Sequence, residues 1–476
     1  VYRAMLPTIQ PGTAAETSAA QPHSYLRLSA RAATIVVPMR FALFTCLTPA
    51  LLLLASSTVA QAFHQRRPNN YSRTTADNAA TKLNKRLAKG ELQLDSEAKT
   101  SRGRLRALLE ALEVPASSQT LVFSKTSLQR HRVSPQNPRA LYFNEDVYVG
   151  WIPGAASIEV IVGDPELGLA FYSMPQDANQ PARLTRDDGC LSCHATSRTQ
   201  DEPGLVLRSV FPDLAGDPIP SAGETDMNFR SPIEARWGGW LVTGQFEGAH
   251  RGNNTATRNS EGNWVVTPKP ARDLHAFAKD FGADRYLRPT SDIGALLALE
   301  QQATVHNLLV RATHQMRYLL DKDRVLNDLL GETQSNEHGM RASTQRIADT
   351  LAKEIAATLL LDGGAPLAQH RAASNAEFAR DFAAMWPKDS DGVQLGELDV
   401  SERTFVLPMS PMIHSKAFQR LPTELRSRVF ARLQVAIERG VPPGDVQLDR
   451  ATRAILAKHL RDTMTDWPPP RVRRNQ

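Results

Sequence analysis

The chain has 476 residues, of which 41% are hydrophobic and 22% charged, a composition typical of globular proteins. This length allows two or three domains with a sizeable core. The formal net charge is +6, but residues 1–62 hold four basic side chains and one acidic side chain, so the rest carries only +3. That balance is too weak to favour nucleic acid or a membrane surface as a partner.

The stretch MRFALFTCLTPALLLLASSTVAQA, which begins at Met39, has the parts of a secretory signal. One arginine precedes an apolar run from Phe41 to Ala55, and the triplet AQA supplies a small-x-small cleavage site ending at Ala62. The run is too short to span a bilayer, and Pro49 disfavours a buried core helix. We expect an upstream extension, a signal peptide over about residues 39–62, export to the periplasm, and no transmembrane span in the mature chain.

Residues 63–115 are charged and rich in Ala and Leu, and RGRLRALLEALEVP predicts an amphipathic helix that stops before Pro115. Residues 116–285 differ, because short β-branched and aromatic runs alternate there with Gly, Pro, Asn and Asp. The runs that predict strands are QTLVFSKTS, RALYFNEDVYVGWIPG, ASIEVIVGDPELGLAFYSM, GLVLRSVFPD and RWGGWLVTG.

Residues 286–476 are predicted to be mainly helical. A long helix should start from a cap at Thr290 or Ser291 and run through TSDIGALLALEQQATVHNLLVRATHQMRYLL. Further helices are expected at 342–361, 366–385, 422–438 and 449–461. The sequence therefore predicts an α+β fold in which a strand-rich region is followed by a helical C-terminal region.

The segment CLSCH, from Cys190 to His194, lies among the predicted strands. Cleavage after Ala62 would remove Cys46, so Cys190 and Cys193 would be the only cysteines of the exported protein. In a c-type cytochrome two such thiols bond to one haem, and the adjacent His binds the iron. This attachment occurs outside the cytoplasm, in agreement with the predicted signal. We expect one covalent haem c, held by Cys190, Cys193 and His194.

Two other interpretations of the cysteine pair need different partners. A structural zinc site needs four ligands, and the exported chain offers neither another cysteine nor a closely spaced pair of histidines. A redox dithiol has no use for the trailing histidine. It stays open as an alternative, because a bare pair would close as a disulfide in an oxidising compartment.

Several segments together resemble a largely uncharacterised family of exported monohaem cytochrome c proteins from several bacterial lineages. They are LVFSKTS, RALYFNEDVYVGW, CLSCH, RSVF, RSPIEARWGGWLVTG, HRGN, HNLLVRA and MIHSKAFQRLP, and they cover about residues 119–440. The resemblance implies haem binding and electron transfer, without a specific substrate. Members often carry histidines where this chain has Phe229 and Gln245-Phe246, so the resemblance does not extend to a His-rich second site.

The face of the iron opposite His194 decides between a carrier and a catalyst, and three side chains are candidates for it. The first is His250, in a Gly- and Asn-rich loop where the resembling family keeps a histidine. Met227 follows the motif by 34 residues, and His306 lies on the long predicted helix, about 80° out of phase with His314. The alternative for His250 is an exposed loop histidine, for Met227 simple packing, and for His306 a structural role.

The haem carboxylates need cationic partners, and aromatic rings can cover the porphyrin. Four arginines lie near the motif in sequence, and we predict that Arg208 contributes to the cofactor site; the other three are Arg186, Arg198 and Arg236. Trp237 is predicted to pack against the haem, and Trp240 is its neighbour. The alternatives are surface charge for the arginines and core packing for the tryptophans.

Three functions remain open. The first is an exported electron carrier that exchanges electrons with periplasmic redox proteins. The second is a peroxidase- or oxygenase-like haem enzyme with an open iron, because 414 residues exceed what a bare carrier needs. The third is a structural or binding protein in which the two thiols form a disulfide. No distal His–Arg pair at helical spacing and no second haem motif is present, so we expect electron transfer rather than catalysis.

Overall fold

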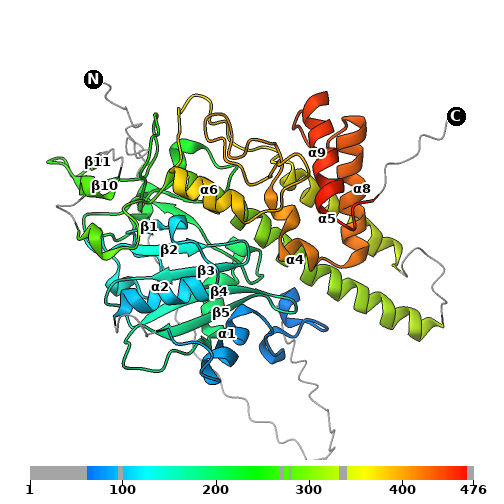
Figure 1. Ribbon diagram of the computed structural model, residues 1–476, viewed down its shortest axis with the longest axis horizontal. Helices are drawn as coiled ribbons and strands as arrows, with labels where there is room; N and C mark the ends of the chain where they lie inside the picture. Colours follow the sequence, from blue (N-terminus) through cyan, green and yellow to red (C-terminus); the bar gives the residue numbers. More distant parts are fainter. Residues whose placement is uncertain (1–61, 95–99, 268–272, 278–280, 332–339, 469–476) are drawn as a thin grey trace, which may run out of the picture. The chain divides into compact units, whose positions relative to one another are not determined.

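The computed structural model describes residues 62–94, 100–267, 273–277, 281–331 and 340–468 (Figure 1). All of them belong to one compact unit, Thr58–Gln476. The predicted α+β fold is confirmed, because a seven-stranded antiparallel sheet precedes a set of C-terminal helices. The predicted signal peptide lies outside the described residues, apart from Ala62.

The main sheet has the strand order β6-β5-β4-β3-β2-β1-β9, and every neighbouring pair is antiparallel. Its strands are β1 Thr120–Val122, β2 Arg139–Phe143, β3 Val147–Trp151, β4 Ser157–Asp164, β5 Gly168–Pro175, β6 Thr185–Arg186 and β9 Trp240–Leu241. Two smaller sheets contain β7 Arg208–Val210 with β8 Glu224–Asp226, and β10 Thr255–Arg258 with β11 Trp264–Thr267. Acidic and amide side chains close the tight turns: Asn144 accepts from the first backbone N–H of β3, and Asp164 from the backbone before β5.

Six of the nine helices in the described residues lie at predicted positions, with two corrections. The nine are α1 Ala79–Ala88, α2 Ser101–Ala111, α3 Leu191–His194, α4 Ile293–Leu330, α5 Ala342–Leu359, α6 Ala376–Ala384, α7 Lys416–Gln419, α8 Thr423–Arg439 and α9 Arg450–Thr463, of which α1, α3 and α7 were not individually predicted. The predicted caps of α4 were wrong, since Asp292 accepts the first free backbone N–H groups. The helix expected from residue 366 begins only at Ala376, because Ala373 pairs instead with Gln245 in a backbone bridge.

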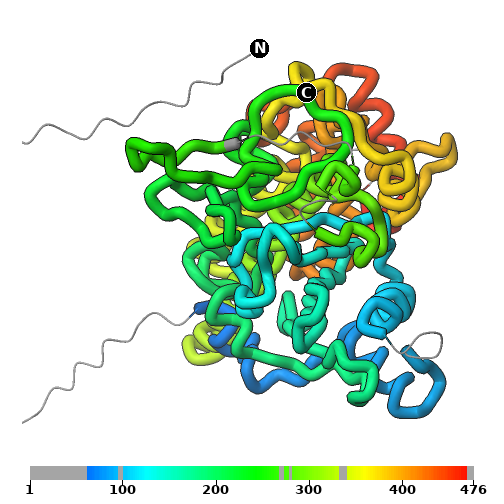
Figure 2. The backbone as a smooth tube through the Cα atoms, turned by 90° about the vertical axis from the view of Figure 1, so that its left-hand side faces the viewer, coloured from blue at the N-terminus to red at the C-terminus, as the bar shows by residue number. Residues whose placement is uncertain are grey.

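The two faces of the sheet pack against different helices. One face, here called the α4 face, carries Phe143, Tyr148 and Phe171, which share a core with α4 and α5. The opposite face carries residues such as Val149 and Tyr172, which pack against α1 and α2. Figure 1 shows α1 and α2 against the strands and α4 running from the sheet past the C-terminal helices. Figure 2 shows the N-terminal segment and the last helices on opposite sides of the strands.

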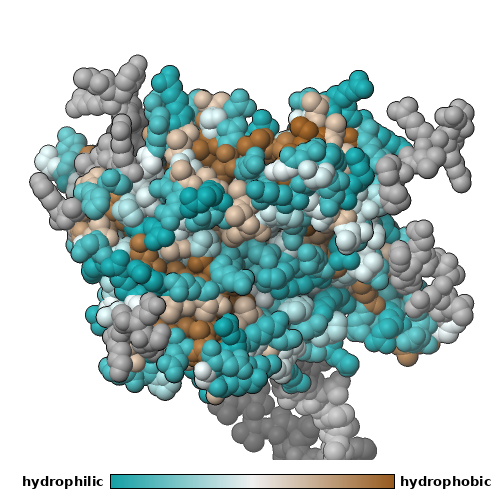
Figure 3. Space-filling view, viewed as in Figure 1, coloured by the Kyte–Doolittle hydropathy of each residue, from teal (hydrophilic) through white to brown (hydrophobic). Residues whose placement is uncertain are grey.

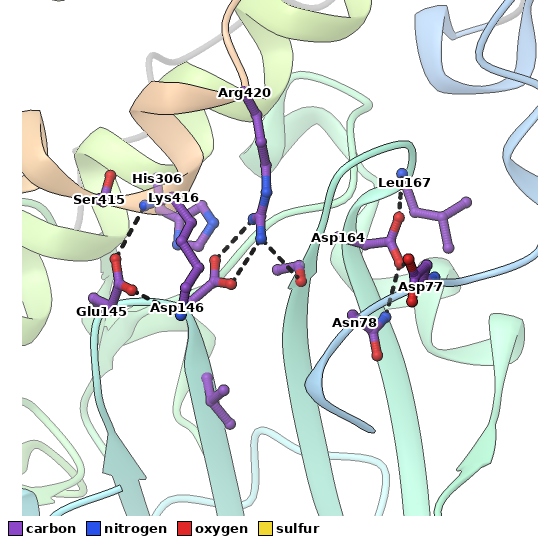
Figure 4. Close-up of polar contacts among 12 residues, drawn as sticks. Asp77, Asn78, Glu145, Asp146, Asp164, Leu167, His306, Ser415, Lys416 and Arg420 are labelled. Carbon is purple, nitrogen blue, oxygen red and sulfur yellow. Dashed lines mark hydrogen bonds and ion pairs between the residues drawn. The ribbon is translucent and has the colours of Figure 1, made fainter. Parts of the chain in front are cut away.

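Ion pairs fasten the segment around α7 to one end of the sheet (Figure 4). The Arg420 guanidinium donates to both carboxylate oxygens of Asp146, at 2.9 and 2.8 Å, and Lys416 pairs with Glu145 at 2.9 Å. Asp164, at the same end, accepts from Asn78, the N-cap of α1. The N-terminal and C-terminal helices are therefore both anchored on the ends of β3 and β4.

The surface in Figure 3 is mostly hydrophilic, with apolar side chains in several separate patches. Within the described parts of the chain, the model contains no helix whose length and apolar character would suffice to cross a membrane.

Candidate functional site

The CLSCH segment lies at the edge of the sheet, where β6 pairs with β5. After Arg186, the backbone N–H of Asp187 donates to the carbonyl of Phe171 at 2.9 Å, and the Asp187 carboxylate accepts from Gly189. This cap starts a short helical turn that continues directly into α3. The turn brings Cys190 close to the α4 face, and its side chain packs against the core on that side.

His194, the last residue of α3, is oriented by one nitrogen of its ring. Its Nδ1 donates to the carbonyl of Gly204 at 2.8 Å, and its ring lies 4.9 Å from that of Phe171. Its Nε2 has no hydrogen-bond partner among the residues that the structure describes. Burial lowers the pKa of His194, so the ring is neutral near pH 7. A neutral ring held at Nδ1 with a free Nε2 is typical of metal-binding histidines.

The two cysteines are free thiols, one half-buried and the other exposed. Burial, with the nearby carboxylates of Asp187 and Glu159, raises the pKa of Cys190 to about 11. Redox dithiols depend instead on a thiol whose pKa is lowered, so that a thiolate exists at neutral pH. The electrostatics around Cys190 therefore disfavour the dithiol interpretation.

The loop that follows the motif is held by α4. Asn307 donates to the carbonyl of Leu205 at 2.8 Å and accepts from its N–H at 2.7 Å, one residue after the carbonyl that orients His194. Glu202, also in this loop and buried, accepts from Nδ1 of His314 at 2.8 Å. The position of the His194 ring thus depends on two side chains of α4.

Replacing Asn307 with Ala should loosen this loop. The Leu205 N–H and carbonyl would lose their partners, at a cost of about 1–3 kcal/mol in the free energy of unfolding. Hydrogen exchange of the backbone N–H groups in residues 195–205 should accelerate, and in the haem-loaded protein the spectrum of the iron should change because His194 is less firmly oriented. Both can be measured on the same sample.

Asn84→Ala is the matched control, because Asn84 holds Leu184 by the same pair of backbone contacts, at 2.7 and 3.0 Å, on the other side of the sheet edge. It should cost similar stability and leave the iron spectrum unchanged. Equal spectral changes in the two variants would contradict the role given to Asn307.

An N-terminal arm, residues 63–74, is bound on both sides of the motif. Before it, Arg186 donates to the carbonyls of Thr74 and Tyr71, at 2.7 and 2.9 Å. After it, the Glu202 carboxylate accepts from the backbone N–H of His64, at 3.1 and 3.2 Å. The arm therefore belongs to the framework that fixes the site.

Three residues predicted for the cofactor site lie together in a separate cluster. Met227 accepts a hydrogen bond through Sδ from the backbone N–H of Trp237 at 3.0 Å, and the ring of His250 lies 5.4 Å from that of Trp237. Burial and nearby His370 lower the pKa of His250 to about 4, and its buried Nδ1 has no partner among the residues that the structure describes. Trp237 is buried at a φ of 63°, a strained conformation for a bulky residue.

The third predicted ligand, His306, lies elsewhere on α4. Its Nδ1 is 3.0 Å from the hydroxyl of Tyr148, which also accepts from Gln302, and its Nε2 is buried without a partner. In the described residues, no hydrogen bond or ring contact joins His306, His250 or Met227 to His194. The structure therefore brings Met227 and His250 together but selects no ligand opposite His194.

The arginines predicted near the motif all have carboxylate partners. Arg208 and Arg198 share Glu224, beside β7 and β8. Arg186 pairs with Asp188, and the buried Arg236 with Glu300. Trp237 also donates to Glu300, at 2.6 Å, and Trp240 donates to the carbonyl of Arg208. Arg208 thus lies beside Trp240, and Trp237 is part of a buried polar group.

The sequence interpretation missed Arg139 and Glu159, which pair with each other on the α4 face. A signal for Arg139 was present, because Arg139, Leu141 and Phe143 alternate along one strand and so share a face. Arg139 is thus a charged residue on a face of β2 whose other two residues, Leu141 and Phe143, are apolar.

Among the described residues, no group of three or more His, Cys, Asp or Glu side chains is placed to hold a metal ion. His194 therefore has no partner ligands from the described residues. It could bind a metal ion only if the ion belonged to a group that supplies the other ligands itself. No protein-family model, curated protein or solved structure matches the chain, so the function of the site is inferred from its own residues and geometry.

Proposed function

We propose that this protein is an exported c-type cytochrome that binds one haem covalently through Cys190 and Cys193 and transfers electrons between periplasmic redox proteins. The observation that carries the proposal is the state of His194. Its Nδ1 is held by the Gly204 carbonyl, its Nε2 has no partner in the described parts of the chain, and it follows two free thiols on a single helical turn. Haem c attachment needs these three groups in this order.

The surroundings of the motif fit a flat, mainly apolar group with a charged edge. Leu141 and Ile161 on the α4 face are only half-buried, although Phe143 and Phe171 in the adjoining positions are buried. Gly150, on the same face, leaves space that the guanidinium of Arg139 occupies. Bound haem would supply one-electron redox chemistry, while the Gly204 carbonyl would orient the histidine.

The proposal of electron transfer rather than catalysis rests on the absence, in the sequence, of a distal His–Arg pair or a second haem motif. The predicted signal peptide supports export and a periplasmic location. The resemblance of the CLSCH and RWGGW segments to exported monohaem cytochromes supports the same assignment. A haem enzyme with an open iron is the alternative, and one measurement separates the two.

That measurement is the optical spectrum of the protein expressed with the haem c maturation machinery. We expect haem c bands in the oxidised and dithionite-reduced states, and no change when carbon monoxide is added to the reduced protein, because an electron carrier has two strong axial ligands. Ready binding of carbon monoxide would favour the enzyme. A colourless protein with Cys190 and Cys193 joined as a disulfide would overturn the proposal.

A further inference from the structure

A charged pair lies on the α4 face beside the CLSCH segment. Arg139 on β2 reaches across β3 and forms an ion pair with Glu159 on β4. Both side chains are partly exposed, at 19% and 25%, although the neighbouring Phe143 and Phe171 on the same face are buried. The pair therefore borders the apolar core and lies next to an accessible part of the face.

The strand register places this pair close to His194. Tyr148, Ile161 and Phe171 are direct partners across β3, β4 and β5, so they form one row on the α4 face. Glu159 lies two residues before Ile161 and is thus a diagonal neighbour of Phe171, at a typical separation of roughly 7–8 Å. The ring of His194 rests on Phe171 at 4.9 Å.

Space for the arginine is provided by Gly150. A Cβ atom at this position would overlap the Arg139 guanidinium, which lies across the glycine. Among the residues that the structure describes, the Nε of Arg139 is buried without a hydrogen-bond partner, and its Nη2 pairs with Glu159. The side chain as a whole is partly exposed, and a planar guanidinium suits a carboxylate ligand.

Building on the proposed function, we propose that Arg139 and Glu159 form the charged border of the haem site, where Arg139 binds a carboxylate of the porphyrin and Glu159 holds Arg139 in position. Two arginines near the motif in sequence lie elsewhere: Arg208 pairs with Glu224 on another sheet, and Arg236 is buried against Glu300. Arg139 differs from them by its position beside His194, because the Nε of Arg208 also lacks a partner among the described residues.

The test is the reduction potential of the haem-loaded protein, measured for three variants at low ionic strength. A positive charge near the iron favours the reduced state, so Arg139→Gln should lower the potential. Glu159→Gln removes a negative charge from the same place and should raise it. Arg428→Gln is the matched control, since Arg428, on α8, is also a partly exposed arginine paired with a carboxylate, that of Asp349, and it should leave the potential unchanged.

Opposite shifts at Arg139 and Glu159, together with an unchanged Arg428 variant, would support the proposal. If haem is attached and neither Arg139→Gln nor Glu159→Gln moves the potential, the pair is structural and the inference is overturned while the cytochrome assignment stands. If no haem is attached to the unaltered protein, the proposed function itself fails. If Arg139→Gln does not fold, Glu159→Gln still tests the sign of the shift. Arg139→Lys keeps the positive charge and should leave the potential close to that of the unaltered protein.

Discussion

A protein in which Cys190 and Cys193 are both replaced by Ala will carry no covalently bound haem. In the proposed cytochrome each thiol would form one bond to the porphyrin, so without both sulfurs nothing would join the cofactor to the chain. The measurement is haem staining of the denatured protein after electrophoresis, combined with the intact mass, since only covalently bound haem remains under those conditions. The single variants should each retain one bond and give weaker staining.

Ser192→Ala is the control for this change. Ser192 lies between the two cysteines and is exposed, and its hydroxyl donates to the carbonyl of Gly189 within the same turn. Removing that hydroxyl leaves both thiols and His194 in place, so staining should match the unaltered protein. Covalent haem in the double cysteine variant would show that another side chain attaches it.

Replacing Arg236 with Met should be the most destabilising single change among those considered. Arg236 and Glu300 are each 2% exposed and pair at 2.7 Å, and Arg236 also donates to the carbonyls of Ser231 and Phe229. Removing one partner of a buried ion pair leaves an uncompensated charge and typically costs about 3–5 kcal/mol. The free energy of unfolding in urea should fall by this amount at pH 8.

The loss should depend on pH, and its direction follows from Glu300. Burial raises the pKa of Glu300 to about 7, against the opposing effects of Arg236 and Trp237. A carboxyl whose pKa is raised in the folded state costs stability as the pH rises through the window between the unfolded and the folded value. Without Arg236 the folded pKa rises further, so the variant should lose little at pH 5 and most at pH 8.

A second variant separates lost charge from lost packing. Arg236→Met combined with Glu300→Leu removes both charges, and replacing a buried pair by apolar residues of similar size is often close to neutral. The double variant should therefore recover much of the stability and lose the pH dependence. A loss below about 1 kcal/mol in Arg236→Met at pH 8 would contradict the buried-charge explanation.

Local patterns in the sequence were sufficient to predict the strands and helices whose formation depends on neighbouring residues. The alternating runs around β2 to β5 predicted strands because side chains on a pleated surface repeat every two residues. The structure of segment 366–375 could not be predicted in this way. Its backbone pairs with Gln245, more than a hundred residues away, and this pairing replaces the expected helix. A helix propensity says nothing about such a partner.

The same distinction applies to the site. Cys190, Cys193 and His194 were identifiable because their chemistry is contained in five consecutive residues. Arg139 and Glu159 lie twenty residues apart, and their meeting across Gly150 depends on the register of three strands. Nearness in sequence instead favoured Arg208, which the fold directs to Glu224.

The N-terminal arm depends on a partner far along the chain. Asn69 of the arm donates to the carbonyl of His314 at 3.0 Å, a contact between residues 245 positions apart. Closing so long a loop costs conformational entropy, so this contact forms only once α4 has packed on the sheet. Until then the chain is not closed around the two cysteines. In the proposed cytochrome, attachment of haem would therefore meet open thiols, and the arrival of α4 would then fix the histidine beside them.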